Sequence, residues 1–149
     1  MHSDCESPFQ FIENRISNLK ITNKLIGGSV AGLQHDISNI DYKVLSIEET
    51  DSGYTGILDL SVGIRLKKGR KVLFSLDIDV EGMFVSGKEI DKPDFEKMLE
   101  INGAAVLFSI ARSVVIAQSA LCFMNGQVRL PMINMLMLYQ KKHSKETDG

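Results

Sequence analysis

Two stretches of alternating sequence decide the fold: ILDLSVGIRL at residues 57–66 and VLFSLDIDVE at residues 72–81. Hydrophobic and polar side chains alternate with period two in both, which is typical of antiparallel strands with one buried and one solvated face. Between them lies KKGR, in which Gly69 predicts a hairpin turn. The two stretches therefore predict the centre of an antiparallel sheet.

Two more strands are expected upstream. DYKVLSIEET at residues 41–50 leads into this pair through Asp51-Ser52-Gly53, a turn signal. A first strand with a weaker pattern is expected at about residues 9–21. The connection between these two strands is too rich in glycine to be regular. Four strands in this order predict either a meander or a Greek key.

The last third of the chain predicts helices. Pro93, followed by Asp94, is typical of a first helical turn. Asn102-Gly103 is expected to interrupt the segment, so that a short helix or turn precedes a long helix at about residues 104–124. Asn125-Gly126 is expected to end the long helix.

A second helix is expected after a connection through Pro131. It would cover residues 131–142, PMINMLMLYQKK, with its lysines in the last turn. The fold class is thus α+β, with a four-stranded antiparallel sheet followed by a long helix and a short C-terminal helix. We expect one domain over residues 1–149, with flexible tails at 1–8 and 143–149.

The long helix is apolar on more sides than packing on one sheet requires. From Ile101 to Gln127 its one charged residue is Arg112. A membrane span fits the length, but Arg112 and several polar residues in the middle oppose it. Covering about five large side chains at roughly 2 kcal/mol each would offset an association cost of about 4–15 kcal/mol. We therefore expect an oligomer, with these interface residues: Val106, Phe108, Ile110, Val114, Ala117 and Leu121.

Composition and charge exclude several classes of function. The formal net charge of −2 gives no basic field that would indicate nucleic acid or an anionic membrane. Two cysteines and three histidines are scattered, which predicts neither a disulfide framework nor a metal site and fits a reducing cytoplasm. No histidine has the context of a catalytic base. We expect no enzyme activity, no cofactor and no metal.

Asp77, Asp79 and Glu81 share one face of a strand. Residues two apart on a strand are about 7 Å apart, so a shared ion or an acid–base pair is one interpretation. A solvated polar face explains the three acids without further assumptions, and we favour it.

Several short motifs together resemble SecB export chaperones. Leu107-Phe108 with Ala111-Arg112 is similar to the Leu-Phe-Pro-Tyr-Ala-Arg segment that opens the long helix of that family. Gly82-Met83-Phe84 resembles its Gly-Ile-Phe, and Leu130 to Asn134 (LPMIN) resembles its Leu-Pro-Pro-Val-Asn. The first strand, with Phe9-Gln10 and Arg15-Ile16, is also similar. The resemblance spans about residues 9–140.

The resemblance implies a cytoplasmic homotetramer, a dimer of dimers with long helices in the interface. Unfolded polypeptides or preproteins would lie in apolar grooves between the sheet, the crossover and the last helix, without a cofactor and without membrane insertion. Methionines suit surfaces that accept many sequences, although they also fill gaps in cores. The expected groove residues are Phe11, Met83, Phe84, Leu130, Met132, Ile133, Met135, Leu136 and Tyr139.

The chain departs from the family where family members dock on the SecA motor. Asp77 matches an acidic strand position, and Asp79 and Glu81 continue that face, which makes it a candidate docking surface. Lys20 and Lys24, however, stand where acids are expected, and a reversed charge opposes docking on the same partner. Delivery to the Sec translocase, service to a toxin–antitoxin system, and a dedicated adaptor role therefore remain open.

The rival from another class is a thioesterase-like fold in which a sheet wraps one long helix. In such folds the helix precedes most strands, whereas here the long helix follows all four, which disfavours the enzyme.

Overall fold

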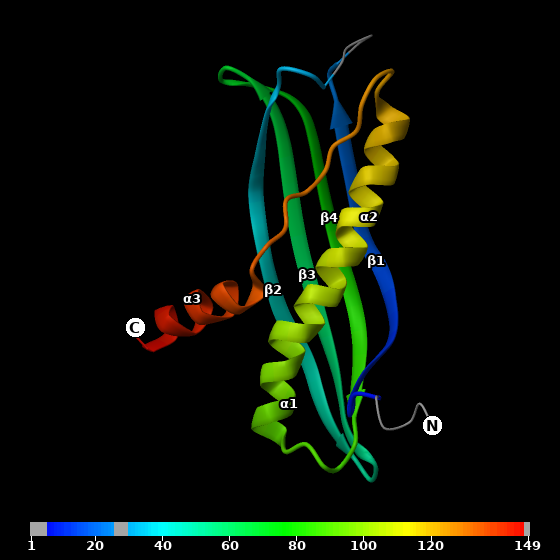
Figure 1. Ribbon diagram of the computed structural model, residues 1–149, viewed down its shortest axis with the longest axis vertical. Helices are drawn as coiled ribbons and strands as arrows, with labels where there is room; N and C mark the ends of the chain where they lie inside the picture. Colours follow the sequence, from blue (N-terminus) through cyan, green and yellow to red (C-terminus); the bar gives the residue numbers. More distant parts are fainter. Residues whose placement is uncertain (1–5, 26–29, 148–149) are drawn as a thin grey trace.

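The computed structural model describes residues 6–25 and 30–147. These residues form an antiparallel sheet with helices lying on one of its faces (Figure 1). The strands are β1 (Phe9–Asn23), β2 (Gln34–Thr50), β3 (Gly53–Lys68) and β4 (Lys71–Ser86). The helical elements are α1 (Lys92–Met98), the π-helical segment η2 (Leu99–Gly103), α2 (Ala104–Cys122) and α3 (Met135–Thr147).

The sheet has the strand order β1-β4-β3-β2. Hairpins join β2 to β3 and β3 to β4, while β1 lies antiparallel beside β4, which is the Greek-key arrangement of the two that the sequence allowed. Strand β2 begins seven residues earlier than the expected start at 41. Gly27 and Gly28 of the expected irregular connection lie outside the described residues. In the strand order β1-β4-β3-β2, the two edge strands are β1 and β2.

The core lies between the helices and the inner face of β3 and β4. Both strands bury every second side chain, as their alternation predicts. The inner side chains of these two strands that are at most 2% exposed are Leu58, Leu60, Val62, Ile64, Leu66, Phe74, Leu76, Ile78, Val80 and Phe84. The outer face of the same strands stays partly exposed.

The helices begin as expected and then continue where an interruption was expected. Asp91 caps α1, its side chain accepting a hydrogen bond of 3.0 Å from the backbone N–H of Asp94. At Asn102-Gly103 the chain does not break; residues 99–103 widen into a π-helical turn, and helix runs from Lys92 to Cys122 over 31 residues. A π-turn accommodates an irregularity without ending the helix.

The end of α2 and the bounds of α3 also differ from expectation. Helix α2 ends at Cys122 because Phe123 is already extended (φ −120°, ψ 146°); Gly126, at φ +89°, turns the following segment instead of capping the helix. Helix α3 starts at Met135 rather than 131, after Asn134, whose side chain accepts from the N–H of Met137 at 3.1 Å. It runs to Thr147, beyond the expected end at 142.

Glycine allows the long helix to approach the sheet closely. A Cβ added at Gly82 on β4 would lie 2.6 Å from Cδ2 of Leu107 on α2. One added at Gly56 on β3 would lie 2.8 Å from Cδ2 of Leu99. Both distances are shorter than any ordinary van der Waals contact. The helix therefore lies directly on the backbone of the two central strands.

Candidate functional site

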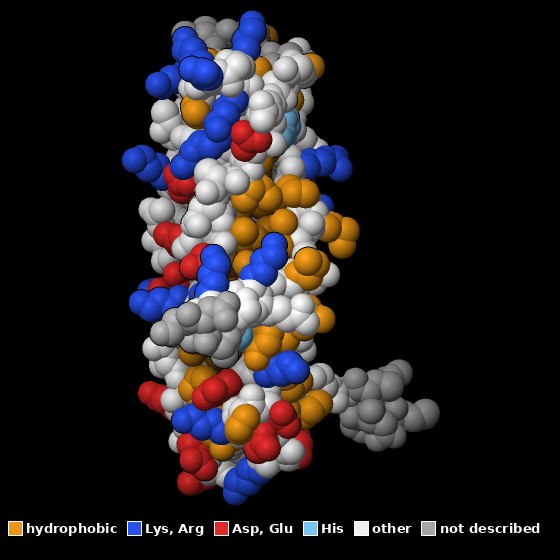
Figure 2. Space-filling view, turned by 90° about the vertical axis from the view of Figure 1, so that its left-hand side faces the viewer, with side chains coloured by type: hydrophobic (Ala, Val, Ile, Leu, Met, Phe, Trp, Pro, Cys, Tyr) orange, Lys and Arg blue, Asp and Glu red, His pale blue; other side chains and the backbone are white. Residues whose placement is uncertain are grey.

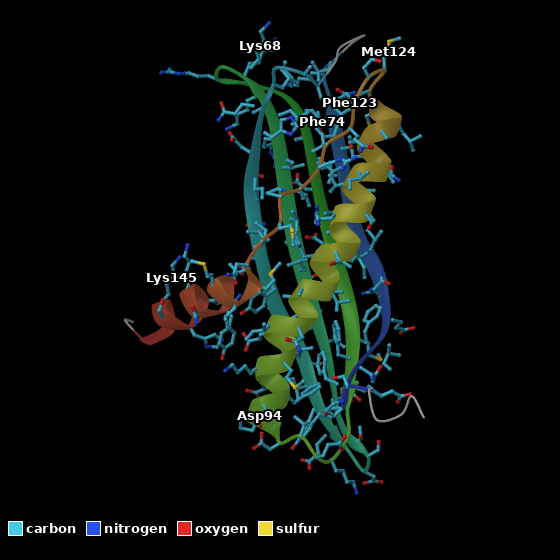
Figure 3. The ribbon with its side chains drawn as sticks, in the orientation of Figure 1. Lys68, Phe74, Asp94, Phe123, Met124 and Lys145 are labelled. Carbon is cyan, nitrogen blue, oxygen red and sulfur yellow. The ribbon has the colours of Figure 1, made fainter. Side chains whose placement is uncertain are left out.

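Residues 123–134, which we call the strap, cross the inner face of the sheet from the end of α2 toward β2 (Figure 1). Phe123 packs on Phe74 with ring centroids 4.9 Å apart, at the end of the molecule where Figure 3 labels both residues. Val128 and Leu130 are buried. The strap is thus an integral part of the core rather than a loose loop.

Two polar contacts from α2 hold the strap in place. The hydroxyl of Ser119, itself buried, accepts a hydrogen bond of 2.7 Å from the N–H of Val128. Nε of Arg112 donates to the carbonyl of Leu130 at 3.0 Å. Because alternate residues of an extended segment point to opposite sides, the burial of Val128 and Leu130 leaves Arg129 facing solvent.

Exposed hydrophobic side chains gather where the strap meets α3. Met132 is 85% exposed, Leu136 and Met137 are about half exposed, and Ile133 is half-buried against the core. We call these four residues the strap surface. Figure 2, with the α3 side toward the viewer, shows hydrophobic side chains gathered at mid-height, with Lys and Arg side chains beside them. Methionine and leucine offer a deformable apolar contact area.

Helix α3 is fastened to β2 and to η2 by a cluster of polar side chains. Oε1 of Glu100 in η2 lies 3.2 Å from the hydroxyl of Tyr42 and 3.1 Å from Nε2 of His143. Nζ of Lys142 lies 2.9 Å from Oδ1 of Asp41, donates to the carbonyl of Tyr42, and sits 4.4 Å above the ring of Tyr42. These contacts fix the direction in which α3 leaves the sheet.

Tyr42 remains a neutral hydrogen-bond donor in this cluster. Its ring is 2% exposed. Burial raises the pKa of its hydroxyl well above the ordinary value, and the negative charge of Glu100 raises that pKa further. The Tyr42–Glu100 bond is therefore present throughout the physiological pH range.

Only part of the predicted groove comes together. Met132, Ile133 and Leu136 lie on the strap surface, and Tyr139 is half-buried on α3 with its ring 4.2 Å from that of His143. Three predicted groove residues belong instead to the core, since the exposed fraction of their side chains is 6% or less: Phe84, Leu130 and Met135. Their side chains face the sheet–helix interface, so the prediction that they line an open groove is wrong.

The two remaining groove residues lie near the β1 edge and on opposite faces of the sheet. Phe11 is on the inner face, where its ring packs 5.4 Å from that of Phe84. Met83, one residue from Phe84 along β4, faces outward and lines a shallow cavity of about 350 Å³ with Ile57, Arg15 and Glu81. The strap crosses toward the other edge, so these two residues do not join the strap surface.

The predicted interface residues on α2 form an outward face with one exception. Phe108 is 5% exposed and packs in the core, so it is removed from the predicted interface. Val106, Ile110 and Val114 are half-buried, Ala117 is exposed, and Leu121 is 81% exposed. The outward side of the helix therefore carries apolar residues together with the exposed Ser109 and Ser113.

Strand β1 adds exposed hydrophobic residues that sequence reasoning missed. Ile16 pairs with Val80 and Leu19 with Ile78, which places both on the inner face, and each remains about 40% exposed. Register shifts at Phe11/Glu13 and Ile16/Asn18 break the period-two pattern, because a bulge inserts a residue and changes which side chains face inward. In the sequence, these bulges are indicated by the weak alternation of residues 9–21.

The acidic residues on the outer sheet face are largely paired with bases. Arg65 lies 3.0 Å from Asp77, and Arg15 lies 2.6 Å from Glu81. Lys20 is the direct β1 partner of Asp77. Asp59, which the sequence did not single out, is the β3 partner of Glu81; desolvation raises the pKa of its carboxyl, and Asp79 and Glu81 raise that pKa further. The face is one of mixed charge rather than an acidic patch.

Metal binding finds little support in the part of the chain that the structure describes. No group of three or more His, Cys, Asp or Glu side chains there is arranged to hold a metal ion. Asp77, Asp79 and Glu81 alternate along the outer face, and Asp77 and Glu81 pair with arginines instead. His2 and Cys5 lie outside the described residues.

The long helix also satisfies the length and composition of a membrane span. In this structure it packs lengthwise on the sheet, with Leu107, Ala111 and Val115 completely buried. Arg112, in its middle, is engaged with the strap. The sheet thus covers one apolar side of the helix, and the strap covers part of another side.

Comparison with known proteins rests on structure. No protein-family model matches the chain, and no curated protein matches it in sequence. The structure of the Mycobacterium tuberculosis SecB-like chaperone Rv1957, in complex with a ChAD peptide from the HigA1 antitoxin, aligns with a TM-score of 0.67. The alignment covers 84% of this chain and 90% of that one, at 12% identity. The chain has the SecB-like fold.

A second similar structure is a protein of unknown function from Streptococcus agalactiae, at a TM-score of 0.45, 8% identity, and coverage of 83% and 97%. The SecB-like fold has the order seen here: four antiparallel strands, a long helix, a crossover and a short C-terminal helix. Low identity is consistent with the substitutions in the family motifs at residues 107–112 and 130–134.

Proposed function

We propose that this protein is an ATP-independent holdase that binds unfolded or pre-export polypeptide segments on its strap surface. The observation that carries the proposal is the exposure of Met132 on a strap that is otherwise anchored in the core, together with that of Leu136 and Met137 at the start of α3. Exposed apolar side chains on a rigid support would accept extended apolar segments without a chemical reaction. The SecB-like fold supports this proposal, because a chaperone of that fold is solved with a peptide bound.

We further propose that the protein self-associates through the outward face of α2. Leu121 on that face is exposed, and so are the inner-face residues Ile16 and Leu19 of β1. Apolar areas of this kind are unusual on a monomer and mark contact surfaces. A second copy of the chain would cover them, which agrees with the dimer or dimer of dimers that the family resemblance implies. A cytoplasmic location and a single chaperone domain complete the proposal.

Delivery to SecA is the less favoured route for this chain. Docking on a basic partner would require free acids on the outer sheet face, but Asp77 and Glu81 are held by Arg65 and Arg15. Lys20 adds a further positive charge beside Asp77. Like charges across an interface are costly. Service to a toxin–antitoxin system, or a dedicated adaptor role, does not require free acids on this face, so we favour either over delivery to SecA.

The test is suppression of aggregation of a chemically unfolded protein on dilution, followed by light scattering, with and without this chain. We expect suppression at near-stoichiometric oligomer. Met132→Asp combined with Leu136→Asp should abolish it, because charges on the strap surface oppose apolar binding. Val72→Asp is the matched control, since Val72 is an exposed hydrophobic residue at the start of β4 and does not belong to the strap surface. A wild-type protein without effect on aggregation would contradict the proposal.

A further inference from the structure

The strap surface lies near positive charges that form no ion pair with an acid in the part of the chain that the structure describes. We propose that it selects apolar polypeptide segments that carry acidic residues beside the apolar ones. This inference rests on the proposed holdase function and names its class of client. It follows from the placement of four bases around the strap surface: Arg112, Arg129, Lys141 and Lys145.

On α3, two of these bases share the exposed face of the helix with a strap-surface residue. Met137, Lys141 and Lys145 follow one another at intervals of four residues, so they lie on one side of the helix. All three are exposed, and Figure 3 shows Lys145 on α3, well away from the sheet. Lys142, in contrast, is engaged with Asp41 on β2. The exposed face of α3 therefore passes directly from apolar to basic.

On the strap and α2, the two arginines are held by neutral groups. Nε of Arg112 donates to the carbonyl of Leu130. The side-chain oxygen of Gln127, in the amide orientation that satisfies both groups, accepts from Nε of Arg129 at 2.9 Å and from its Nη2 at 2.7 Å. Neutral acceptors position a guanidinium without cancelling its charge. Within residues 6–25 and 30–147, none of the four bases lies in an ion pair with an acid.

Among the acids whose side chains the structure describes, those nearest α3 are already engaged. Asp41 and Glu100 hold Lys142 and His143. The carboxylates of Asp77 and Glu81 are on the outer face of the sheet, opposite the strap. In the sequence as a whole, residues 104–149 carry five Lys and Arg against two acids, whereas residues 1–103 carry twelve against seventeen. The chain is acidic in total, but the segment that carries the strap surface is basic.

Exposed ion pairs are weak, so the expected selectivity is modest. Each exposed pair changes an affinity by about 1.4- to 5-fold. A segment with two well-placed acids should therefore bind about 2- to 25-fold more tightly than its neutral counterpart at low salt. The difference should shrink as ionic strength rises, because the Debye length falls to about 3 Å at 1 M salt.

The experiment compares three fluorescent 12-residue peptides that have the same apolar core but Glu, Gln or Lys on both flanks. Binding to the full-length protein is followed by fluorescence anisotropy at about 20 mM and about 500 mM salt. We expect the order of affinity Glu, Gln, Lys at low salt, and convergence of the three at high salt. The double variant Arg129→Glu with Lys141→Glu should reverse the order.

The matched control is Arg70→Glu with Lys71→Glu, a charge reversal of the same size on the β3–β4 hairpin. It should leave the order of the three peptides unchanged. Equal binding of the three peptides to the wild-type protein would overturn the acidic preference and leave the holdase function standing, whereas no binding of any peptide would overturn the holdase function itself. Stable binding to vesicles of anionic lipid, competed by none of the peptides, would assign the surface to a membrane and overturn this inference.

Discussion

The hydroxyl of Tyr42 on β2 donates a hydrogen bond of 3.2 Å to Oε1 of Glu100, which belongs to the π-helical segment η2. The same oxygen lies 3.1 Å from Nε2 of His143 on α3. One carboxylate therefore connects the edge of the sheet, the irregular part of the long helix and the C-terminal helix. The π-turn places Glu100 at this junction, and the junction holds α3 beside the strap surface.

Removal of the Tyr42 hydroxyl should loosen this junction. We expect Tyr42→Phe to lower the free energy of unfolding by about 1.5–3 kcal/mol, because a partly buried hydrogen bond to a charged carboxylate is lost while the ring remains. Urea unfolding followed by circular dichroism measures the change. Tyr54→Phe is the control, since the ring of Tyr54 stacks on Phe95 and that contact is kept. Equal losses for both variants would show that the Tyr42–Glu100 bond contributes nothing of its own.

Ser119 is expected to be required for the anchoring of the strap. Ser119→Ala would leave the buried N–H of Val128 without its acceptor, at a cost of about 1–3 kcal/mol. Hydrogen exchange at the Val128 amide should become markedly faster, and thermal unfolding should begin at a lower temperature. Ser113→Ala is the matched control, because Ser113 is exposed and its hydroxyl bonds to the carbonyl of Ser109 within the same helix. Unchanged exchange at Val128 would contradict the anchoring role.

Leu121 is expected to lie in the interface between copies of the chain. Leu121→Asp replaces an apolar side chain, worth about 1.5–3 kcal/mol when buried, by a charge. We therefore expect at least about a tenfold rise in the dissociation constant of the oligomer, measured as molar mass by light scattering over a dilution series. Leu45→Asp, at an exposed leucine of β2, should leave the mass unchanged. A wild-type monomer at all concentrations would refute self-association.

Asp59 should make stability depend on pH in a defined direction. Its folded-state pKa is raised, by desolvation first and by Asp79 and Glu81 next. The folded protein therefore holds this proton more tightly than the unfolded chain, and the resulting stabilisation is present below the ordinary aspartate pKa and lost as pH rises through the folded value. Asp59→Asn should accordingly raise the melting temperature at pH 7 relative to the wild-type protein, and the gain should shrink below about pH 4. If the melting temperature rose equally at pH 7 and below about pH 4, titration of Asp59 would be excluded as the cause of the rise.

The sequence by itself determined the sheet and the start of the helical part. The alternation in residues 57–66 and 72–81 allows only one face of each strand to be buried. The two stretches form the two central strands, with their hydrophobic side chains inward. Pro93 and Asp94 marked the helix start, because a proline and an acid in the first turn act locally and need no distant partner. Such features depend on residues that are neighbours in the chain, so they can be predicted from the sequence.

The tertiary structure alone decided which hydrophobic residues stay exposed. Phe108, Phe84 and Leu130 were predicted at open surfaces and are buried, because periodicity shows that a side chain lies on an apolar face but not which other element covers that face. The bulges of β1 and the π-turn at residues 99–103 likewise arise where long strands and a long helix must fit one another. The strap surface exists because α3, held by Glu100, leaves Met132 and Leu136 uncovered.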